Sequence, residues 1–367
     1  MRPRVPPVIV AALLAAAVCH GAGRRHKNCL DAPFQQSLLQ RLMRSIRLSA
    51  AADVGGQSLV ILEKQWPTHQ LSTAITRTLI REVLGHDVVV KQWPATFGSY
   101  ELIANGQADL DMELWATSSA EEYDRFHTSA NRRGANAKYI VHAGNTFDHG
   151  RSGLFMRPGT GHEHELLTDG RMYSYANTTL VPKLPTMAEA QSLCDPTLEH
   201  DPCQEMPNRI CHDQECRAVL KVNDVYDKTL VEKMIRCSSL PLGIVYIGWS
   251  LEQVLKTYNK SQSLLFYWWE PDAYITPDII RLNFDAPDLC DYGSTTSKLP
   301  SNLACDFKNG GVHKGFGKRV EKLYPDVRHL VESYTIQAAT ILDLQAQLSG
   351  NLSKQCSNGC SAEQRKQ

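Results

Sequence analysis

The chain has 367 residues, of which 39 are basic (Lys and Arg) and 39 are acidic, so its formal net charge is +0. A length of this order accommodates two domains of ordinary size or one large domain. Because nucleic-acid binding needs a basic surface, the balanced charge argues against a nucleic-acid partner. Hydrophobic residues make up 43% of the chain and charged residues 21%, which is typical of a soluble globular protein.

Residues 1–23 predict a secretory signal peptide. Arg2 and Arg4 precede an apolar run from Val8 to Cys19, which is too short to span a bilayer, and the small residues after it offer a cleavage site. A bacterial lipoprotein is the weaker interpretation, because bulky Val18 stands where a small residue is expected. No later stretch is apolar for long enough to be a membrane helix, so we expect a secreted, extracellular chain, or a periplasmic one in a bacterium.

Ten cysteines follow the predicted signal peptide. They are Cys29, Cys194, Cys203, Cys211, Cys216, Cys237, Cys290, Cys305, Cys356 and Cys360. An even number after a signal peptide favours disulfides. Zinc binding by Cys211, His212 and Cys216 is the alternative, but their spacing fits no standard zinc pattern, so no metal is expected. Glycosylation sequons begin at Asn177, Asn259 and Asn351.

Residues 24–56 precede the main fold as an N-terminal extension, in which an amphipathic helix is predicted. Apolar side chains recur there at every fourth position, at Phe34, Leu38, Leu42 and Ile46. We expect this helix to pack on the main body of the protein. A basic helix on a membrane surface is the alternative, and Asp31 together with several Gln residues weakens it by diluting the charge.

Strands and helices alternate between residues 58 and 115. The strands are predicted at 58–63, 87–91 and 110–115, and a short helix at 100–104. A longer helix is predicted between Thr68, which can cap it, and Gly85, which ends it; Gly106 closes the short one. This β-α-β-α-β unit predicts an α/β fold with a parallel sheet built by right-handed crossovers.

The rest of the chain continues the alternation, with one long interruption. Helices are predicted near 120–133, 250–258, 314–323 and 326–348, and strands near 138–142, 154–156, 243–247 and 264–269. The stretch from 159 to about 240 is polar, rich in cysteine and predicted to consist mainly of loops. Beyond residue 350, a loose tail is expected, in which Cys356 and Cys360 pair with each other.

Three tryptophans stand where predicted strands end: Trp66, Trp115 and Trp269. In α/β folds, ligands bind outside the carboxyl ends of the strands. Several aromatic faces that converge there can hold a quaternary ammonium ion, and the helix that begins after Trp66 can attract a carboxylate with its amide groups. A zwitterion of the betaine type would satisfy both. Glu113 lies two residues before Trp115, so it shares that face of its strand.

The alternative is that these tryptophans belong to the core, which is the commoner place for a single Trp. Three of them at equivalent strand ends are harder to assign to the core alone. Trp93 and Trp249 are expected to be packing residues. Because Trp268 and Trp269 are adjacent in a strand, we expect them to point to opposite faces, with only one of them toward the ligand.

Several short motifs occur in a fixed order between residues 58 and 345. They are Trp66-Pro-Thr68, Leu84-Gly85-His86, Leu102-Ile-Ala-Asn-Gly106-Gln-Ala-Asp109, Trp115, His149-Gly150-Arg-Ser-Gly153 and Phe266-Tyr-Trp-Trp-Glu-Pro271. In these motifs the chain resembles the glycine betaine/choline substrate-binding proteins of ABC importers, in a secreted and cysteine-rich version typical of a eukaryote. The resemblance implies a two-lobed, hinged α/β fold of the type II periplasmic-binding-protein kind, with the ligand in the cleft between the lobes.

The resemblance also implies a division of the chain. Lobe 1 is expected to comprise residues 57–152 and 270–350, and lobe 2 residues 153–269 with the cysteine-rich insert. Residues 351–367 form the tail. The lobes would exchange between an open state and a closed state, and the ligand would shift the population to the closed one.

Carried over residue by residue, the resemblance implies an aromatic cage. The candidate ligand-binding residues are Trp66, Thr68, Glu113, Trp115, Phe155 and Trp269. Phe155 is the candidate for a fourth wall. The family often has Asn before the second tryptophan and Pro two residues after it, whereas this chain has Leu114 and Thr117 there. These departures concern the identity of the ligand more than the fold.

Two other functions are alternatives to ligand capture. An enzyme is the first, and the sequence offers little for one: His162-Glu-His-Glu165 lacks the spacing of a metalloprotease, and no Gly-x-Ser-x-Gly motif occurs. We therefore expect no catalytic residues and no cofactor. The second is a secreted ligand-sensing or interaction module with the same fold and no transporter. The resemblance implies a monomer whose partners are a quaternary ammonium ligand and a membrane transporter or receptor.

Overall fold

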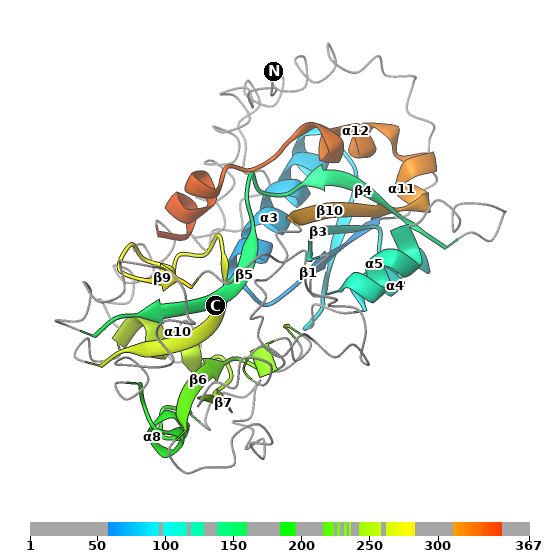
Figure 1. Ribbon diagram of the computed structural model, residues 1–367. Coiled ribbons are helices and arrows are strands. Elements are labelled where there is room, and N and C mark those ends of the chain that lie inside the picture. The colour runs from blue at the N-terminus through cyan, green and yellow to red at the C-terminus, as the bar shows by residue number, and fades with distance from the viewer. Residues whose placement is uncertain are drawn as a thin grey trace. The chain divides into compact units, whose positions relative to one another are not determined.

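The computed structural model describes most of the predicted α/β body (Figure 1). The described residues are 58–94, 98–115, 119–127, 138–159, 184–195, 216–223, 226–227, 231–232, 235, 242–257, 262–282 and 311–346. The predicted signal peptide, the N-terminal extension, the three sequons, His162 to Glu165 and the tail lie outside them. The chain divides into two compact units: unit 1 is Met1–His149 with Gly311–Gln367, and unit 2 is Gly150–Gly310.

Unit 1 contains a five-stranded mixed sheet flanked by helices. Its elements are β1 (Leu59–Glu63), α3 (Pro67–Thr78), the π-helical turn η1 (Leu79–Val83), β2 (Val88–Gln92), α4 (Ser99–Ala104), β3 (Leu110–Trp115), α5 (Ala120–His127), β4 (Ile140–Asn145), β10 (Val312–Gly317), α11 (Lys318–Leu323), α12 (Pro325–Ser333) and a last helix at 338–346. The strand order is β2-β1-β3-β10-β4. β1 runs parallel to β2 and β3, and β10 runs antiparallel to β3 and β4.

Unit 2 repeats this arrangement. Its elements are β5 (Arg151–Arg157), α8 (Met187–Gln191), β6 (Arg217–Lys221), β7 (Leu242–Tyr246), α10 (Ser250–Thr257), β8 (Leu264–Glu270) and β9 (Ile280–Arg281), in the sheet order β7-β6-β8-β5-β9. β6 runs parallel to β7 and β8, while β5 runs antiparallel to β8 and β9.

The two sheets share one strand order. In each unit, the first of the three parallel strands (β1 or β6) lies between the second (β2 or β7) and the third (β3 or β8). The strand by which the chain enters from the other unit lies next to the third parallel strand and runs antiparallel to it. That strand is β5 in unit 2 and β10 in unit 1. Two mixed α/β sheets of this order constitute the type II periplasmic-binding-protein fold, which confirms the predicted fold class.

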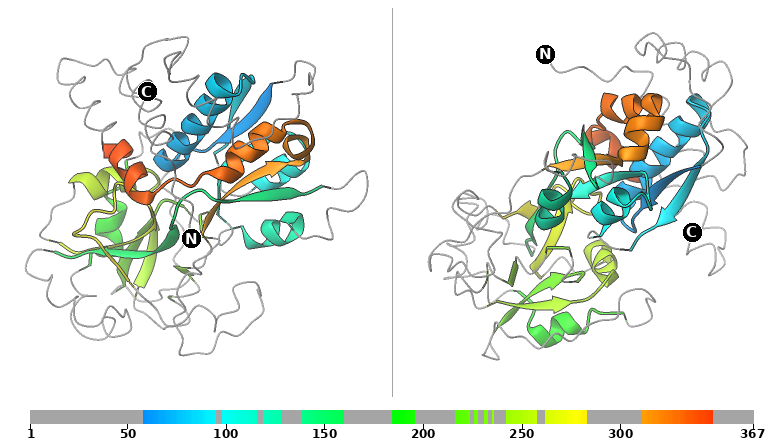
Figure 2. Two further views of the ribbon diagram at one scale, coloured as in Figure 1. Left: turned by 90° about the horizontal axis from the view of Figure 1, so that it is seen from above. Right: turned by 90° about the vertical axis from the view of Figure 1, so that its right-hand side faces the viewer.

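The central strand β3 explains how unit 1 positions polar groups in its interior. All six of its residues are buried, and they alternate between apolar and polar or aromatic. Leu114 packs with Tyr100 and Ile140 in a core cluster on the face covered by α4 and α5. Asp111 and Glu113 lie on the opposite face, which α3 covers (Figures 1 and 2). One strand thereby serves an apolar layer and a polar layer.

Four segments differ from the sequence predictions. Residues 314–317 belong to β10 and not to a helix, because Val312 and Phe316 complete the pairing between β3 and β4. The predicted helix at 326–348 is broken at residues 334–337, where Ile336 pairs with Phe147. The predicted loop region contains β6, the second strand of the sheet in unit 2. Residues 270–282 lie in unit 2, because β9 pairs with β5.

None of the helices in the described part of the chain combines the length and the apolar character needed to cross a bilayer.

The apolar layer of β3 generates a stability prediction. Leu114→Ala would remove a fully buried side chain from the core cluster, and we expect unit 1 to lose about 2–5 kcal/mol of unfolding free energy. Val89 lies in the edge strand β2 and is 52% exposed, so Val89→Ala is the matched control. It should change the unfolding free energy by less than about 0.5 kcal/mol. Urea denaturation followed by circular dichroism measures both. Equal losses would contradict the assignment of this layer as the core.

Candidate functional site

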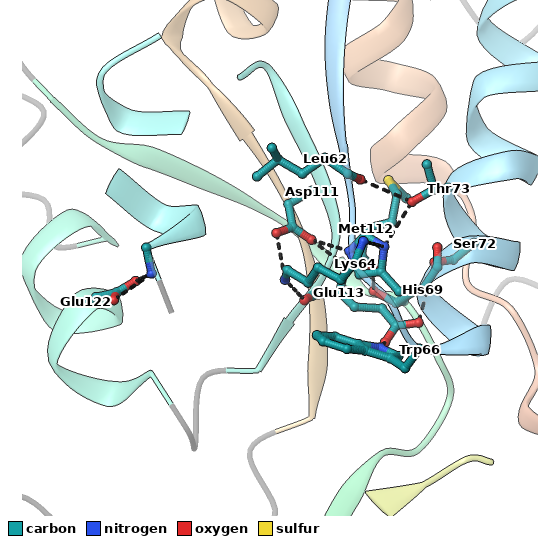
Figure 3. A network of polar contacts seen from close by, with 12 residues as sticks. Leu62, Lys64, Trp66, His69, Ser72, Thr73, Asp111, Met112, Glu113 and Glu122 are labelled. Carbon is teal, nitrogen blue, oxygen red and sulfur yellow. Dashed lines mark hydrogen bonds and ion pairs between the residues drawn. The ribbon is translucent and has the colours of Figure 1, made fainter. Parts of the chain in front are cut away.

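A network of buried polar contacts lies between β3 and α3 in unit 1 (Figure 3). Pro67 at the first helical position starts α3 after the extended residue Trp66. The helix then turns a row of small polar side chains toward the sheet: Thr68, His69, Ser72, Thr73 and Thr76 are all buried. Since β3 offers carboxyl groups on the facing side, donors and acceptors meet directly.

A buried ion pair anchors this layer. Lys64 follows the last residue of β1, and its Nζ lies 2.8 Å from Oδ2 of Asp111 on β3. The same ammonium donates a hydrogen bond to the carbonyl of Glu113 at 2.6 Å. Burial raises the pKa of Asp111, but the charge of Lys64 and the hydrogen bond from His69 outweigh it and lower that pKa to about 2. Asp111 is therefore ionised under all physiological conditions.

His69 completes the ion pair from the helix side. Its Nε2 lies 2.9 Å from Oδ1 of Asp111, and its Nδ1 accepts the backbone N–H of Lys64 at 3.2 Å. With Nδ1 as an acceptor, the ring is neutral and carries its proton on Nε2. Burial, the largest influence, lowers the pKa of His69, which agrees with a neutral ring.

Asp111, His69 and Thr73 have the connectivity of a catalytic triad but not its chemistry. Thr73 Oγ1 lies 3.1 Å from His69 Nδ1, and it donates to the carbonyl of Leu62 at 3.2 Å. Because Nδ1 already accepts the N–H of Lys64, it is not free to take a proton from the hydroxyl. All three side chains are fully buried. The three residues hold the end of β1, the start of β3 and the helix α3 together.

Trp66 and Glu113, two of the candidate site residues, are joined directly. The indole Nε1 of Trp66 donates to Oε2 of Glu113 at 2.6 Å, and Thr68 Oγ1 donates to the same oxygen at 3.3 Å. Burial raises the pKa of Glu113 to about 8, although these hydrogen bonds and the charge of Lys64 act in the opposite direction. Glu113 is therefore a protonated acid at neutral pH, and it fixes the orientation of Trp66.

Hydroxyl and indole donors face both oxygens of Glu113. The Ser72 hydroxyl lies 3.0 Å from the carbonyl of His69 and 3.5 Å from Oε1 of Glu113, and it can donate to either acceptor. Oε2 remains the acceptor for Trp66 and Thr68.

The ring of Trp66 is held on two further sides. The Nζ of Lys64 lies 5.4 Å from the ring centroid, and the imidazole of His69 packs edge-on at 5.5 Å. The indole therefore already takes part in one cation–π contact inside unit 1. Trp66 is 1% exposed. Trp115, the last residue of β3, pairs with Val312 of β10 and is 8% exposed.

The remaining aromatic candidates belong to unit 2. Trp269 lies in β8, is 5% exposed and stacks on Trp268 with centroids 4.4 Å apart and planes 5° apart. Tyr226 packs against Trp269 at 5.5 Å, and Trp249 meets both stacked indoles edge-on at 6.5 Å. Phe155 in β5 is fully buried and stacks on Phe266 with centroids 6.1 Å apart.

The stacking corrects one prediction. Trp268 and Trp269 were expected to point to opposite faces of their strand, yet their rings lie parallel and in contact. β6 pairs with β8 only at Leu220 and Phe266, so β8 continues beyond the pairing. We attribute the stacking to this free edge, around which both indoles can turn toward Tyr226 and Trp249.

Unit 2 has a buried lysine at the end of its own first parallel strand. Lys221, the last residue of β6, lies 2.6 Å from Oδ1 of Asp227 and 3.0 Å from Oε1 of Glu232. Lys64 directly follows the first parallel strand of unit 1, and Lys221 is the last residue of the first parallel strand of unit 2. In both units, the tryptophan of the neighbouring third strand stands two residues further along than the lysine, counted from the residues that pair between the two strands. The sequence prediction missed both lysines; a charged residue directly after a buried strand was the available signal.

The structure thus joins Trp66, Thr68 and Glu113 within unit 1 and places Trp115 at the end of the same strand as Glu113. The other two candidates, Phe155 and Trp269, lie in unit 2. Among the described residues, no three His, Cys, Asp or Glu side chains are arranged to hold a metal ion. Cys194 and Cys216, the two cysteines in the described residues, are disulfide-bonded.

The buried ion pair generates a prediction on stability. Asp111→Asn leaves the Lys64 ammonium buried without a counter-charge, and we expect a loss of about 3–5 kcal/mol of unfolding free energy. Asn can still accept from His69, so the double variant Lys64→Met/Asp111→Asn should recover more than half of the loss. Urea denaturation of Lys64→Met, Asp111→Asn and the double variant completes a thermodynamic cycle. If the losses of the two single variants simply added up in the double variant, Lys64 and Asp111 would not stabilise the protein as a pair.

Glu113 generates a prediction on pH. The folded protein holds this proton up to about pH 8, whereas the ordinary pKa is 4.5, so the folded state binds the extra proton between these values. The contribution of Glu113 to the unfolding free energy is fully present below pH 4.5 and is lost as the pH rises toward 8. Relative to Glu113→Gln, the wild type should lose stability over this window and stay level above it. Parallel pH profiles of the two proteins would refute a buried neutral acid.

Comparison with solved structures finds similar chains at low sequence identity. The first, lactococcal OpuAC in a closed conformation complexed with glycine betaine, has 12% identity and a TM-score of 0.48, over 85% of this chain and 94% of that chain. The second, the glycine/betaine/L-proline-binding protein ProX of an ABC transporter from Borrelia burgdorferi, has 13% identity and a TM-score of 0.48, over 84% and 90%.

A third similar structure is an ABC-transporter choline binding protein in complex with choline, with 14% identity and a TM-score of 0.46, over 82% of this chain and 89% of that chain. No protein-family model and no curated protein sequence matches the chain. The likeness to these binding proteins lies in the overall fold, and the assignment of that fold here rests on the strand order of the two sheets.

Proposed function

We propose that the chain is an extracellular solute-binding protein that captures a quaternary ammonium compound, such as glycine betaine or choline, against tryptophan rings. The observation that carries the proposal is the equivalence of Trp115 and Trp269. Each stands at the carboxyl end of the third strand in a sheet of the same order, β3 in unit 1 and β8 in unit 2. In α/β sheets, this end of the strands is where ligands bind.

The chemistry of the rings favours a cation without hydrogen bonds. An indole face attracts a cation by its quadrupole, and a quaternary ammonium has no N–H groups to leave unsatisfied in a dry site. The contact contributes roughly 0.5–2 kcal/mol for each desolvated face. A dissociation constant on the order of micromolar corresponds to about −8 kcal/mol, so several such contacts have to act together. Trp66 contributes a ring whose N–H is already held by Glu113.

The fold favours a role in ligand delivery over a role in catalysis. In the described residues, the triad-like group of Asp111, His69 and Thr73 is fully hydrogen-bonded within unit 1 and leaves no activated nucleophile. We propose that the protein carries its ligand to a membrane transporter of the ABC type, acting as a secreted monomer. A sensor or interaction module of the same fold would bind the ligand and lack that partner.

Calorimetric titration of the purified protein with glycine betaine and with choline tests the ligand. We expect saturable binding in the micromolar range, and a loss of roughly two- to thirtyfold in affinity for Trp115→Ala and for Trp269→Ala, because each removes one cation–π face. Trp93→Ala is the matched control: Trp93 packs against the core cluster of unit 1 and should keep the wild-type affinity.

Circular dichroism must show that each variant is folded before its affinity is compared. If the folded wild type bound neither compound, the quaternary ammonium proposal would be wrong and the interaction module would be the remaining interpretation. If Trp93→Ala lost affinity as strongly as the other two variants, the effect would be one of stability and not of the rings.

A further inference from the structure

The edge strand β2 leaves apolar surface open at one end of the sheet in unit 1. Among the described strands, it pairs only with β1, and none of its five residues is buried. Val89, at 52% exposure, and Leu323, at 47%, are the exposed large hydrophobic side chains in the described part of the chain. An exposed apolar edge strand invites pairing with other chains, and folded proteins usually cover such an edge with a helix or a loop.

The sheet of unit 2 provides an internal comparison. β7 holds the same place there as β2 does in unit 1, since it is the second parallel strand and lies at the end of its sheet. All five residues of β7 are buried, and α8 packs against it. One strand order therefore has a covered edge in unit 2 and an open one, within the described residues, in unit 1.

Apolar neighbours extend Val89 into a patch. Val89 pairs with Val60 of β1, so the two side chains point to the same face of the sheet. Val60, Trp93 and Leu102 are partly buried and pack against the core cluster that contains Leu114, on the face covered by α4. We call Val60, Val89, Trp93 and Leu102 the edge patch.

The backbone of β2 is also open on its outer side. Trp93, directly after β2, donates its backbone N–H to the carbonyl of Glu63 at 2.8 Å. Because backbone groups alternate in direction along a strand, the N–H groups of Val90 and Gln92 point away from β1. None of the described strands pairs with them. These two amides therefore report on whatever covers the edge.

The chain carries an apolar segment of matching length just before β1. Within residues 24–56, apolar side chains recur at every fourth position, at Phe34, Leu38, Leu42 and Ile46. As a helix, the stripe from Phe34 to Ile46 is about 18 Å long, and a strand of five residues such as β2 is about 17 Å long. One such helix can therefore cover the whole edge.

The connection to β1 keeps this segment within reach of the patch. Ser58 is fixed at the start of β1, where its carbonyl accepts hydrogen bonds from the Arg319 guanidinium at 3.3 Å. The residues from Ile46 to Ser58 span at most about 40 Å when extended. A tether of this length gives the segment an effective concentration on the order of millimolar at the patch, so a weak contact suffices to hold it there.

The charges around the edge complement those of the segment. Asp87 precedes β2 and Glu101 precedes Leu102 in α4, and both acids are exposed. Lys91, half-buried, is the basic residue of β2. Between its apolar positions, the segment carries the arginines Arg41, Arg44 and Arg47. Ion pairs at such a rim contribute little affinity, but they favour one orientation of the helix.

We propose that residues 33–48 form a helix whose apolar stripe covers the edge patch, so that the N-terminal extension prevents β2 from pairing with a second copy of the chain. The inference goes beyond the proposed function and does not depend on the ligand. The tethered helix leaves the patch in a separate step before unit 1 unfolds, so the unfolding free energy of unit 1 does not include its contact with Val89.

Hydrogen exchange measured by mass spectrometry on the full secreted chain tests the contact from the side of the extension. Leu42→Asp places a charge in the apolar stripe, and we expect the amides of Val90 and Gln92 to exchange at least tenfold faster than in the wild type. Gln40→Asp adds the same charge on the opposite side of the predicted helix. It is the matched control and should exchange like the wild type.

The reciprocal variant tests the contact from the side of β2. Val89→Asp should speed exchange in residues 34–46 by a similar factor, because the helix loses its partner. Leu323→Asp is the matched control, since Leu323 is exposed to a similar degree but lies in α11, outside the edge patch. It should leave exchange in the extension unchanged. Circular dichroism must show that every variant is folded.

Light scattering tests the protective role of the extension. We expect Leu42→Asp to self-associate at concentrations at which the wild type is a monomer. Adding Val89→Lys to Leu42→Asp should restore the monomer, because a lysine on an edge strand opposes pairing between chains. A monomeric Leu42→Asp variant with freely exchanging β2 amides would overturn this role.

Three exchange results would overturn the contact itself. The first is wild-type exchange of the β2 amides in Leu42→Asp. The second is equal acceleration by Leu42→Asp and Gln40→Asp, or by Val89→Asp and Leu323→Asp, which would indicate general destabilisation. The third is protection of residues 34–46 only when vesicles containing phosphatidylserine are added, which would assign the apolar stripe to a membrane surface. None of these results bears on the proposed ligand.

Discussion

The ion pair between Lys64 and Asp111 is the interaction on which the polar side of unit 1 depends. It joins Lys64, directly after β1, to Asp111, the second residue of the adjacent strand β3, and both side chains are buried. Because a buried charge without a partner is costly, the pair fixes the relative positions of β1 and β3 and, through His69, that of α3. The position of Trp66 follows, since it lies between Lys64 and the first turn of that helix.

The same layer separates two acids by their surroundings. Asp111 has an ammonium and an imidazole N–H, so it is charged; two residues along the strand, Glu113 has neutral donors and keeps its proton. The strand supplies both residues to one face, and Lys64 after β1, together with His69 of α3, stabilises Asp111 as the anion. Structural stability and a group that can change its charge thus coexist a few ångströms apart.

The sequence predicted the parallel strands and helices of the first half closely, because their apolar periodicity and capping residues are local. It missed β10, whose Gly315 and Gly317 interrupt the pattern and whose pairing is entirely with distant strands. It selected Trp66 and Glu113 individually, but their hydrogen bond depends on the rotation of α3 over β3. The stacking of Trp268 on Trp269 depends on where β6 stops pairing, which spacing along the chain does not encode.

The strand order of unit 1 also imposes an order on folding during synthesis. β4, at the edge of the sheet, pairs only with β10 among the described strands. Unit 2 spans Gly150–Gly310, and β10 begins after it, at Val312. A ribosome therefore releases all of unit 2, a contiguous segment, before the sheet of unit 1 can close. Until then β4 exposes unpaired edges, so the nascent N-terminal half depends on protection by chaperones or on its own solubility.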